Sequence, residues 1–283
     1  MPTINEVYRN SLNKLKNRSL EEINVRILLC YVNHLSSMSD FFVNKEQEVA
    51  SLGLFDSLFE QYLKGYPVQY LTHEASFLGN TFYVDENVLI PRMETEEVVS
   101  FAIELIRKTF PNKSNLEIAD ICTGSGCIGL TLASIFKTST VFLSDISESA
   151  LNVAKKNGAK MGLDNTTYYL GETLDPVLQD QKTCDVIVSN PPYIISKNNV
   201  DESTFKYEPH LALFTDENAS IYEKIIRKSL LFGNSPLLLV FEISDEVKPI
   251  LETLVNEKYP EAKSEFKKDM NGHFRIFSLL FNK

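Results

Sequence analysis

Apolar side chains in the first part of the chain recur at steps of three and four positions. The recurring positions are Leu12, Leu15, Val49, Leu52, Phe55, Leu58, Phe59 and Tyr62. Steps of this size place side chains on one face of an α-helix. Gly65 and Pro67 then interrupt the pattern, because both residue types end helices. The pattern predicts a small helical domain over residues 1–74, which we expect to recognise the substrate.

The pattern changes between residues 75 and 90, where β-forming residues replace the helical spacing. They are Phe77, Phe82, Tyr83, Val84, Val88, Leu89 and Ile90. Turn-forming residues, Gly79 with Asn80, separate the two halves of this segment. The simplest prediction is a β-hairpin that links two domains. Pro91 ends it, and residues 94–110 have the spacing of an amphipathic helix.

Strand-like and helix-like segments alternate from residue 116 to the end of the chain. Strands are predicted at residues 116–121, 140–143, 167–170, 186–189 and 236–243, and helices at 129–136, 148–161, 219–231 and 245–258. Residues 266–268 and 274–281 are predicted to form an antiparallel pair. Alternation of this kind predicts an α/β domain over residues 91–283, with a doubly wound, mostly parallel sheet. Ligands in such sheets bind at the carboxyl ends of the strands.

Composition narrows the class of protein. The chain has 283 residues, of which 43% are hydrophobic, and its net charge is -10. An acidic chain is a poor general binder of nucleic acid, because phosphate binding needs clustered Lys and Arg. We therefore expect no stable nucleic-acid binding.

Cysteine and histidine positions argue against a metal site. The four cysteines form no paired Cys-x-x-Cys spacing, and the four histidines form no ligand pair at helical spacing. The first ten residues are polar, and no segment approaches the roughly 18 apolar residues of a membrane span. We expect a cytoplasmic protein with reduced thiols and no metal.

A glycine-rich segment follows the strand predicted at residues 116–121. Candidate ligand-binding residues here are Asp120, Cys122, Thr123, Gly124, Ser125 and Gly126. With Gly129 the segment spells G-x-G-x-x-G, which alone would suggest a dinucleotide and a hydride-transfer enzyme. The Asp120 carboxylate, however, suits a cationic ligand better than a pyrophosphate. The glycines let the backbone approach either ligand closely.

Acidic residues end the next two predicted strands. Asp145, followed by Ile146, ends the strand at 140–143, where an acid accepts hydrogen bonds from both ribose hydroxyls. Such an acid serves nicotinamide and S-adenosylmethionine sites alike. Glu172 and Thr173 follow the strand at 167–170, where we expect contact with an adenine amino group.

The most specific signal is the run Asn190, Pro191, Pro192 and Tyr193 at the end of an apolar strand. An amide or exocyclic amine nitrogen is a poor nucleophile because its lone pair is delocalised. The Asn190 side-chain oxygen and the Pro191 carbonyl can accept both of its N–H bonds and aim its lone pair. The prolines stiffen this turn, and the Tyr193 ring can stack on the planar group. The run predicts methyl transfer to a planar nitrogen.

These residues resemble a known family. The glycine-rich loop over residues 120–126 (the Gly loop) and the Asn-Pro-Pro-Tyr run together resemble those of class I S-adenosylmethionine-dependent methyltransferases that modify planar nitrogens. Six further segments are similar to the peptide-chain release factor glutamine methyltransferases, the HemK/PrmC family. They are residues 67–70, 77–79, 88–96, 145–151, 207–213 and 268–275. The resemblance covers about residues 65–283. The residues before them resemble the family only in forming a short helical domain.

The resemblance implies a Rossmann-like methyltransferase domain with seven strands. It implies transfer from S-adenosylmethionine to the side-chain nitrogen of the glutamine in the Gly-Gly-Gln loop of a release factor, with S-adenosylhomocysteine as product. The family's cofactor positions correspond to residues 122–126, Asp145 and Asn190, and its substrate positions to residues 190–193. We expect Arg92 and Glu94 to shape the acceptor pocket or its lid. The family often has an aromatic residue near Thr173 and Pro in place of Met93.

Three alternatives stay open at this point. An adenine-N6 or other nucleic-acid amino-methyltransferase would use the same four-residue run, although such enzymes usually carry a basic surface or a large recognition domain. A nicotinamide oxidoreductase would explain the Gly loop but not Asn190 and its neighbours. A non-catalytic module that binds release factors or ribosomes would not need both sites. We expect the chain to act as a monomer.

Overall fold

The computed structural model describes residues 1–16, 18–196 and 200–282. The chain folds into two compact units, each with its own hydrophobic core. The first unit is Met1–Glu74 with Glu202–Tyr207, and the second is Ala75–Asp201 with Glu208–Lys283. Within the described residues, no helix is both long enough and apolar enough to cross a membrane.

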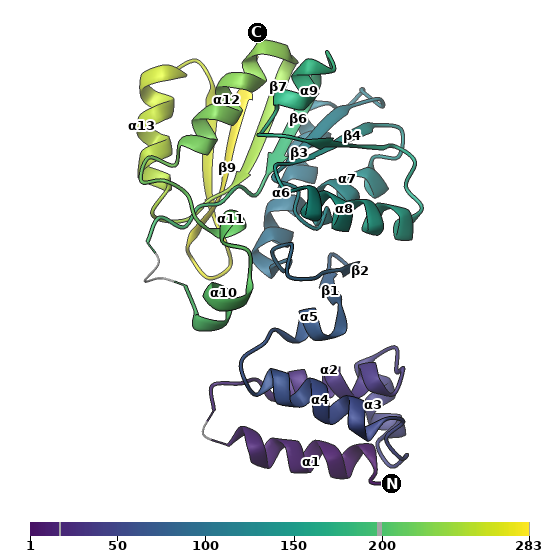
Figure 1. Cartoon of the computed structure of the whole chain (residues 1–283). Coiled ribbons are helices and arrows are strands. Elements are labelled where there is room, and N and C mark those ends of the chain that lie inside the picture. The colour runs from purple at the N-terminus through teal and green to yellow at the C-terminus, as the bar shows by residue number, and fades with distance from the viewer. Residues whose placement is uncertain (17, 197–199, 283) are drawn as a thin grey trace. The chain divides into compact units, whose positions relative to one another are not determined.

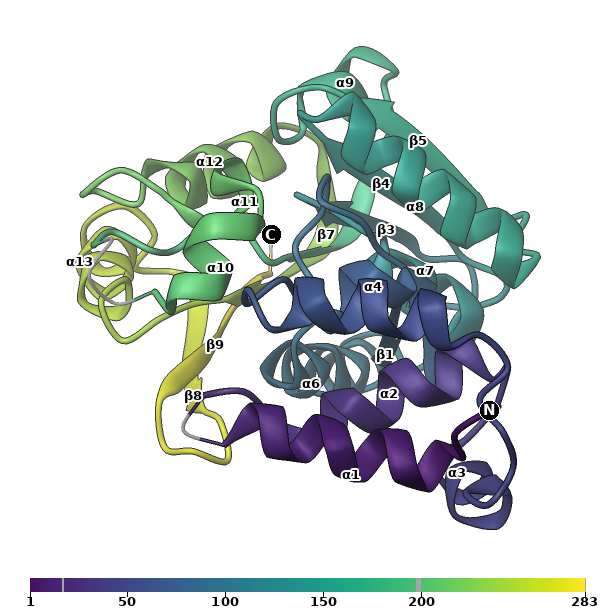
Figure 2. The same ribbon diagram turned by 60° about the horizontal axis from the view of Figure 1, so that its bottom comes forward.

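Helices build the first unit. They are α1 (Ile4–Leu15), α2 (Glu22–Val32), α3 (Met38–Asn44), α4 (Leu52–Tyr62) and α5 (Val68–Thr72). Thr3 starts α1 with a reciprocal cap, since its hydroxyl accepts from the Glu6 amide and the Glu6 carboxylate accepts from the Thr3 amide. Helix α2 lies between α1 and α4 (Figure 2) and buries Val25, Leu28 and Leu29 completely.

A short helix from the middle of the chain completes the first unit. This helix, α10 (Glu202–Tyr207), is held to the segment after α4 by side-chain bonds to the backbone. The Ser203 hydroxyl donates to the Gly65 carbonyl over 2.7 Å. The Tyr207 hydroxyl donates to the Lys64 carbonyl over 3.2 Å. Residues distant in sequence therefore belong to one compact unit.

The two units differ from the expected domain boundaries at two segments. Residues 75–90, expected as a separate linker, belong to the second unit, and residues 202–207 belong to the first. Strands β1 (Glu74–Phe77) and β2 (Asn80–Tyr83) form the hairpin. The predicted strand character of residues 88–90 is not realised, because the Ile90 amide donates to the Glu208 carboxylate instead of to a strand.

The second unit is built on a seven-stranded sheet with the order β5-β4-β3-β6-β7-β9-β8. Its strands are β3 (Glu117–Ile121), β4 (Thr140–Asp145), β5 (Thr166–Leu170), β6 (Cys184–Ser189), β7 (Gly233–Glu242), β8 (Lys263–Lys268) and β9 (Phe274–Phe281). Strands β3 to β7 pair in parallel, and β9 pairs antiparallel with β7 and β8. The predicted mostly parallel sheet is confirmed. The strand order reverses between β3 and β6, which is where ligands bind in such sheets.

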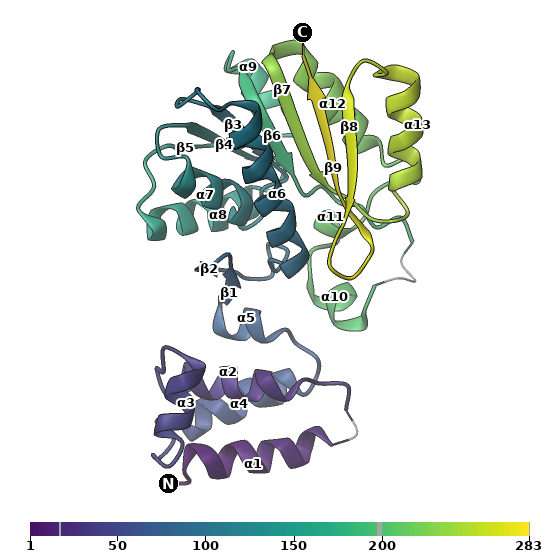
Figure 3. The same cartoon turned by 180° about the vertical axis from the view of Figure 1, so that it is seen from behind.

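Helices cover both faces of this sheet (Figures 1 and 3). One face carries α6 (Met93–Thr109), α7 (Cys127–Ile135) and α8 (Glu148–Met161). The other carries α9 (Asp175–Gln179), α12 (Ser220–Phe232) and α13 (Lys248–Lys258). The four residues of α11 (His210–Leu213) lie in the segment before α12. The central strands β3, β4, β6 and β7 are mostly buried because both faces of the sheet are covered, whereas the edge strands β5 and β8 are partly to largely exposed.

Candidate active site

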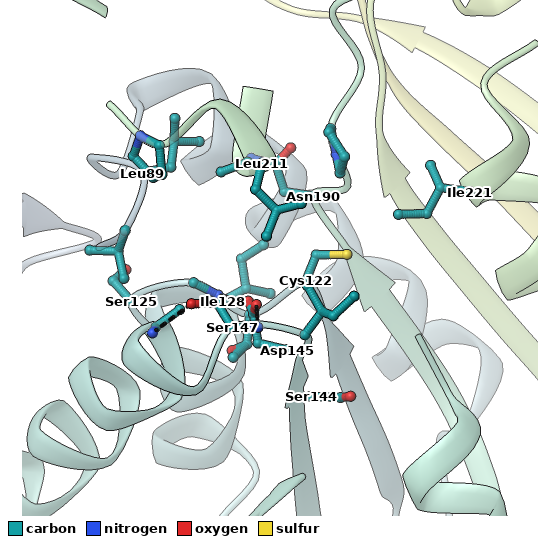
Figure 4. Close-up of a pocket in the computed structure, with 18 of the residues that line it drawn as sticks. Leu89, Cys122, Ser125, Ile128, Ser144, Asp145, Ser147, Asn190, Leu211 and Ile221 are labelled. Atoms are coloured by element: carbon teal, nitrogen blue, oxygen red, sulfur yellow. Dashed lines mark hydrogen bonds between the residues drawn. The ribbon is translucent and has the colours of Figure 1, made fainter. Parts of the chain in front are cut away.

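A cavity of about 340 Å³ opens at the carboxyl ends of β3, β4 and β6, in the second unit. Its size falls in the range of small-molecule sites. Figure 4 shows Asp145 and Asn190 on the same cavity, with Cys122 nearby. The predicted residues that line it are Arg92, Cys122, Thr123, Gly124, Ser125, Asp145, Ile146, Glu172, Thr173, Asn190 and Pro192. Residues from five separate segments thus meet near the switch point of the sheet.

The loop between β3 and α7 depends on glycine at two places. Gly124 has φ +54° and Gly126 has φ +82°, in the left-handed region that disfavours other residues. A Cβ atom on Gly126 would lie 2.8 Å from Cδ1 of Leu130, so a side chain there would also collide with α7. The glycines therefore let the loop turn tightly, and of the two only Gly124 is among the described wall residues.

Asp120 supports this loop from behind. It is fully buried, and its Oδ2 atom accepts from the Thr123 hydroxyl over 2.5 Å and from the Gly129 amide over 2.8 Å. A Cβ atom on Gly129 would lie 2.9 Å from this oxygen, so glycine is needed for the close approach. Among the described residues Asp120 is not part of the cavity wall. Its position favours a role in shaping the loop over the direct cofactor contact expected from the sequence.

Burial raises the pKa of Asp120 to about 7, although its two hydrogen bonds oppose the shift. A carboxyl whose pKa is higher in the folded state than in the unfolded state stabilises the fold fully when the pH is below its pKa in the unfolded state. That stabilising contribution is lost as the pH rises through the pKa of the folded state. We expect the free energy of unfolding to fall by roughly 1–2 kcal/mol from Asp120 alone between about pH 5.5 and about pH 7. In Asp120→Asn this component should be missing, because the amide does not titrate.

Urea unfolding of the wild type and of Asp120→Asn at both pH values measures the difference. The asparagine oxygen can still accept from Thr123 and Gly129, so the variant is a matched neutral control. The same pH slope in both proteins would contradict the assignment.

Asp145 sits at the end of β4 with its carboxylate oriented by the backbone. Its Oδ2 atom accepts from the Gly124 amide and its Oδ1 atom from the Ser147 amide, each over 2.9 Å. Burial raises its pKa, and these bonds oppose the shift. An ionised carboxylate can accept about four hydrogen bonds. Asp145 therefore has acceptor sites left for a pair of ribose hydroxyls, which fits the expected adenosine cofactor.

Glu172 and Thr173 line the same cavity but already have lysine partners. The Glu172 carboxylate pairs with the Lys224 ammonium over 2.7 Å, and this hydrogen bond lowers its pKa. The Thr173 hydroxyl accepts from Lys228 over 3.1 Å. The expected adenine contact would have to share Glu172 with Lys224.

Asn190 follows β6 and reaches the cavity, and its amide group is held from the side. Its Nδ2 atom lies 3.5 Å from the Thr95 hydroxyl, which lies 2.6 Å from Oε2 of Glu242. Pro191 is buried, and Pro192 lines the cavity. Asn190 thus contacts Thr95, which in turn contacts Glu242. Neither Thr95 nor Glu242 was predicted from the sequence as a site residue.

Tyr193 lies outside the wall that the described residues form. Its ring centre is 5.9 Å from the guanidinium carbon of Arg275. Burial raises the pKa of its hydroxyl, and the Glu242 charge adds to the shift. The ring is placed against Arg275, whereas the sequence suggested stacking on the acceptor.

Arg92 and Glu94 differ in their placement. Arg92 lines the cavity, and its guanidinium bonds to the carboxylate of Glu208, whose other oxygen accepts from the Ile90 amide over 3.0 Å. Glu94 is not among the described wall residues, while the next residue, Thr95, is. Arg92 and Glu208 together tie the segment before α6 to the segment before α11.

Several wall residues were not predicted from the sequence. They include Leu89, Thr95, Leu211, Phe214, Ile221 and Lys224. The apolar ones follow no common periodic pattern, because Leu89 and Phe214 lie outside the helices and strands, Leu211 lies in α11 and Ile221 in the first turn of α12. A signal did exist for Glu242: a lone acid ends an otherwise apolar strand, and buried acids at strand ends are candidates for sites.

Similar proteins were found for the whole chain. The family described as methyltransferase small domain matches residues 95–206. The chain is 32% identical over 283 residues to the release factor glutamine methyltransferase of Mycoplasma mycoides subsp. mycoides SC, covering 96% of this chain and 98% of that protein. It is 33% identical over 288 residues to the protein of that name from Bacillus subtilis (strain 168), covering 100% and 99%.

Among solved structures, the hMettl16 catalytic domain in complex with the MAT2A 3′UTR hairpin 6 matches with a TM-score of 0.52. The match covers 70% of this chain and 74% of that one, at 16% identity. Identity this low shows a shared fold and nothing about the substrate.

Proposed function

The chain belongs to the release factor glutamine methyltransferase family, and we propose that it transfers a methyl group from S-adenosylmethionine to a release factor. The acceptor is the side-chain amide nitrogen of the glutamine in the Gly-Gly-Gln motif. The observation that carries the proposal is that Asn190, after β6, lines the same cavity as Asp145, after β4. One residue suits a planar nitrogen and the other suits the ribose of the methyl donor.

The cofactor half of the cavity has the groups that an adenosine cofactor needs. Asp145 would accept from the ribose hydroxyls, while its bonds to the Gly124 and Ser147 amides keep it in place. The apolar side chain of Ile146, which is 55% exposed, offers a surface for the flat base. S-adenosylmethionine supplies a methyl group on a positively charged sulfur, and S-adenosylhomocysteine is the product.

The acceptor half holds and orients a weak nucleophile. The Asn190 oxygen would accept one N–H of the glutamine amide, and the Pro191 carbonyl the other. Both bonds turn the face of the nitrogen toward the methyl group and favour the positive charge that develops on the nitrogen. A new N–C bond forms as the S–C bond breaks, and one N–H proton then leaves. Catalysis comes from orientation and preorganised dipoles, so no strong base is needed.

Methyl transfer with a labelled donor tests the proposal. The protein is incubated with labelled S-adenosylmethionine and either intact release factor, the same factor with its Gly-Gly-Gln glutamine replaced by alanine, or RNA and DNA. We expect label on that glutamine by mass spectrometry, and none on the replaced factor. Label on a nucleic-acid base with none on glutamine would favour an amino-methyltransferase of nucleic acid, which the net charge of -10 disfavours.

We also propose that the first unit contributes to recognition of the release factor. A single glutamine on a loop gives too small a contact for specific binding, which typically needs on the order of 1,000 Å² or more. Hydrogen exchange measures this without altering the chain. Adding release factor should slow exchange of backbone amides in residues 1–74. Turnover of the factor with no protection in that segment would contradict this role.

A further inference from the structure

The amide group of Asn190 can face the acceptor in two ways, and only one of them is productive. If its oxygen faces the cavity, it accepts an N–H from the substrate. If its NH2 group faces the cavity, two donors meet and the contact is repulsive. What lies on the other side of Asn190 therefore decides whether it can function.

We propose that Thr95 and Glu242 form a positioning pair that turns the Asn190 oxygen toward the acceptor nitrogen. This inference rests on the proposed function and extends it to two residues. Three separate elements meet here: the end of β6, the first turn of α6 and the end of β7. The Thr95 hydroxyl lies 2.6 Å from Oε2 of Glu242 and 3.5 Å from Nδ2 of Asn190.

Donor and acceptor chemistry fixes the direction of this chain of contacts. While Glu242 is ionised it only accepts, so the single hydroxyl proton of Thr95 is then donated to Glu242. The hydroxyl oxygen is then only an acceptor toward Asn190. Its partner must be the NH2 group of Asn190, and the Asn190 oxygen is left for the substrate. The 3.5 Å separation is at the long end for a hydrogen bond, and contacts of this kind in active sites often tighten once substrate binds.

The positive charge of Arg275 favours the ionised form of Glu242, which only accepts hydrogen bonds. Glu242 is fully buried, and Thr95 is 2% exposed. Nη1 of Arg275 lies 4.0 Å from Oε1 of Glu242, and Nε of Arg275 pairs with Asp269 over 3.2 Å. Burial raises the pKa of Glu242, while the Thr95 bond and the Arg275 charge oppose the shift. A buried carboxylate is costly unless it is paired, and a purely structural tie between α6 and β7 would not need one.

Two substitutions at residue 95 separate positioning from packing. Thr95→Val keeps the shape but removes the hydroxyl, and Thr95→Ser keeps the hydroxyl but removes a methyl group. We expect Thr95→Val to lower kcat on release factor by at least about tenfold, because a misplaced acceptor loses part of the orientation effect. Its Kd for S-adenosylhomocysteine should stay near the wild-type value. Thr95→Ser should restore most of kcat.

Calorimetry gives the Kd, and a methyl-transfer assay gives kcat and KM. Wild-type kcat in Thr95→Val, or equal losses in Thr95→Val and Thr95→Ser, would overturn the inference. If Thr95→Val fails to fold, Glu242→Gln takes its place. The glutamine amide can donate to Thr95 and free the hydroxyl to bond the Asn190 oxygen, so kcat should fall while cofactor binding persists. Unchanged kcat there would overturn the inference as well. Failure of the wild type to methylate release factor would instead refute the proposed function.

Discussion

Replacing Asn190 with alanine is expected to lower kcat for methylation of release factor by about 100- to 1,000-fold, the usual effect of removing one preorganised polar group from an active site. The variant loses the oxygen that fixes the acceptor nitrogen, and the proline turn alone cannot replace it. Binding of S-adenosylhomocysteine should change little, because Asp145 and the Gly loop are untouched. Single-turnover kinetics and calorimetry give the two quantities separately.

Asn115→Ala provides a matched control, because Asn115 is exposed and lies before β3, outside the described cavity wall. It should retain wild-type kcat. Near-normal turnover by Asn190→Ala would show that the acceptor is held by other groups. Loss of cofactor binding in parallel with kcat would assign Asn190 to the cofactor half of the site.

Replacing Asp145 with alanine is expected to weaken S-adenosylhomocysteine binding by ~1.5–3 kcal/mol, the value of hydrogen bonds to a charged group. The loss has two sources. The ribose hydroxyls lose their acceptor, and the Gly124 amide loses the carboxylate that holds the loop. Calorimetric titration measures the change, and circular dichroism establishes that the variant is folded.

Asp164→Ala is the control for Asp145→Ala, since Asp164 is an exposed acid that follows α8. Its Kd should equal that of the wild type. Unchanged binding in Asp145→Ala would mean that the ribose lies elsewhere in the cavity.

The sheet could be predicted because its signal is local. Buried parallel strands such as β6 appear as continuous apolar runs, and the helices between them have their own spacing. Asp145 and Asn190 could be predicted for the same reason: each directly follows such a run. Parallel strands have their carboxyl ends at the same edge of a sheet, so Asp145 and Asn190 are expected to lie close together.

The contacts behind the site are not local and could not be predicted in this way. Thr95 and Glu242 are 147 positions apart, and their contact depends on how α6 packs beside β7. The burial of Asp120 depends on the close approach of Gly129, which only the folded backbone reveals. The position of Tyr193 depends on Arg275, from the last strand. Each of these needs the whole second unit to be assembled.

The placement of α10 limits how this protein could be divided. The backbone passes between the two units three times, after Glu74, after Asp201 and after Tyr207. Removal of residues 1–74 would leave α10 without the carbonyl partners that Lys64 and Gly65 provide. An exchange of the leading segment between relatives would graft helices that no longer match the resident α10. We therefore expect functional chimeras only when residues 202–207 are transferred together with residues 1–74. The first unit must be exchanged as these two segments, because they are separate in the sequence but form one compact unit.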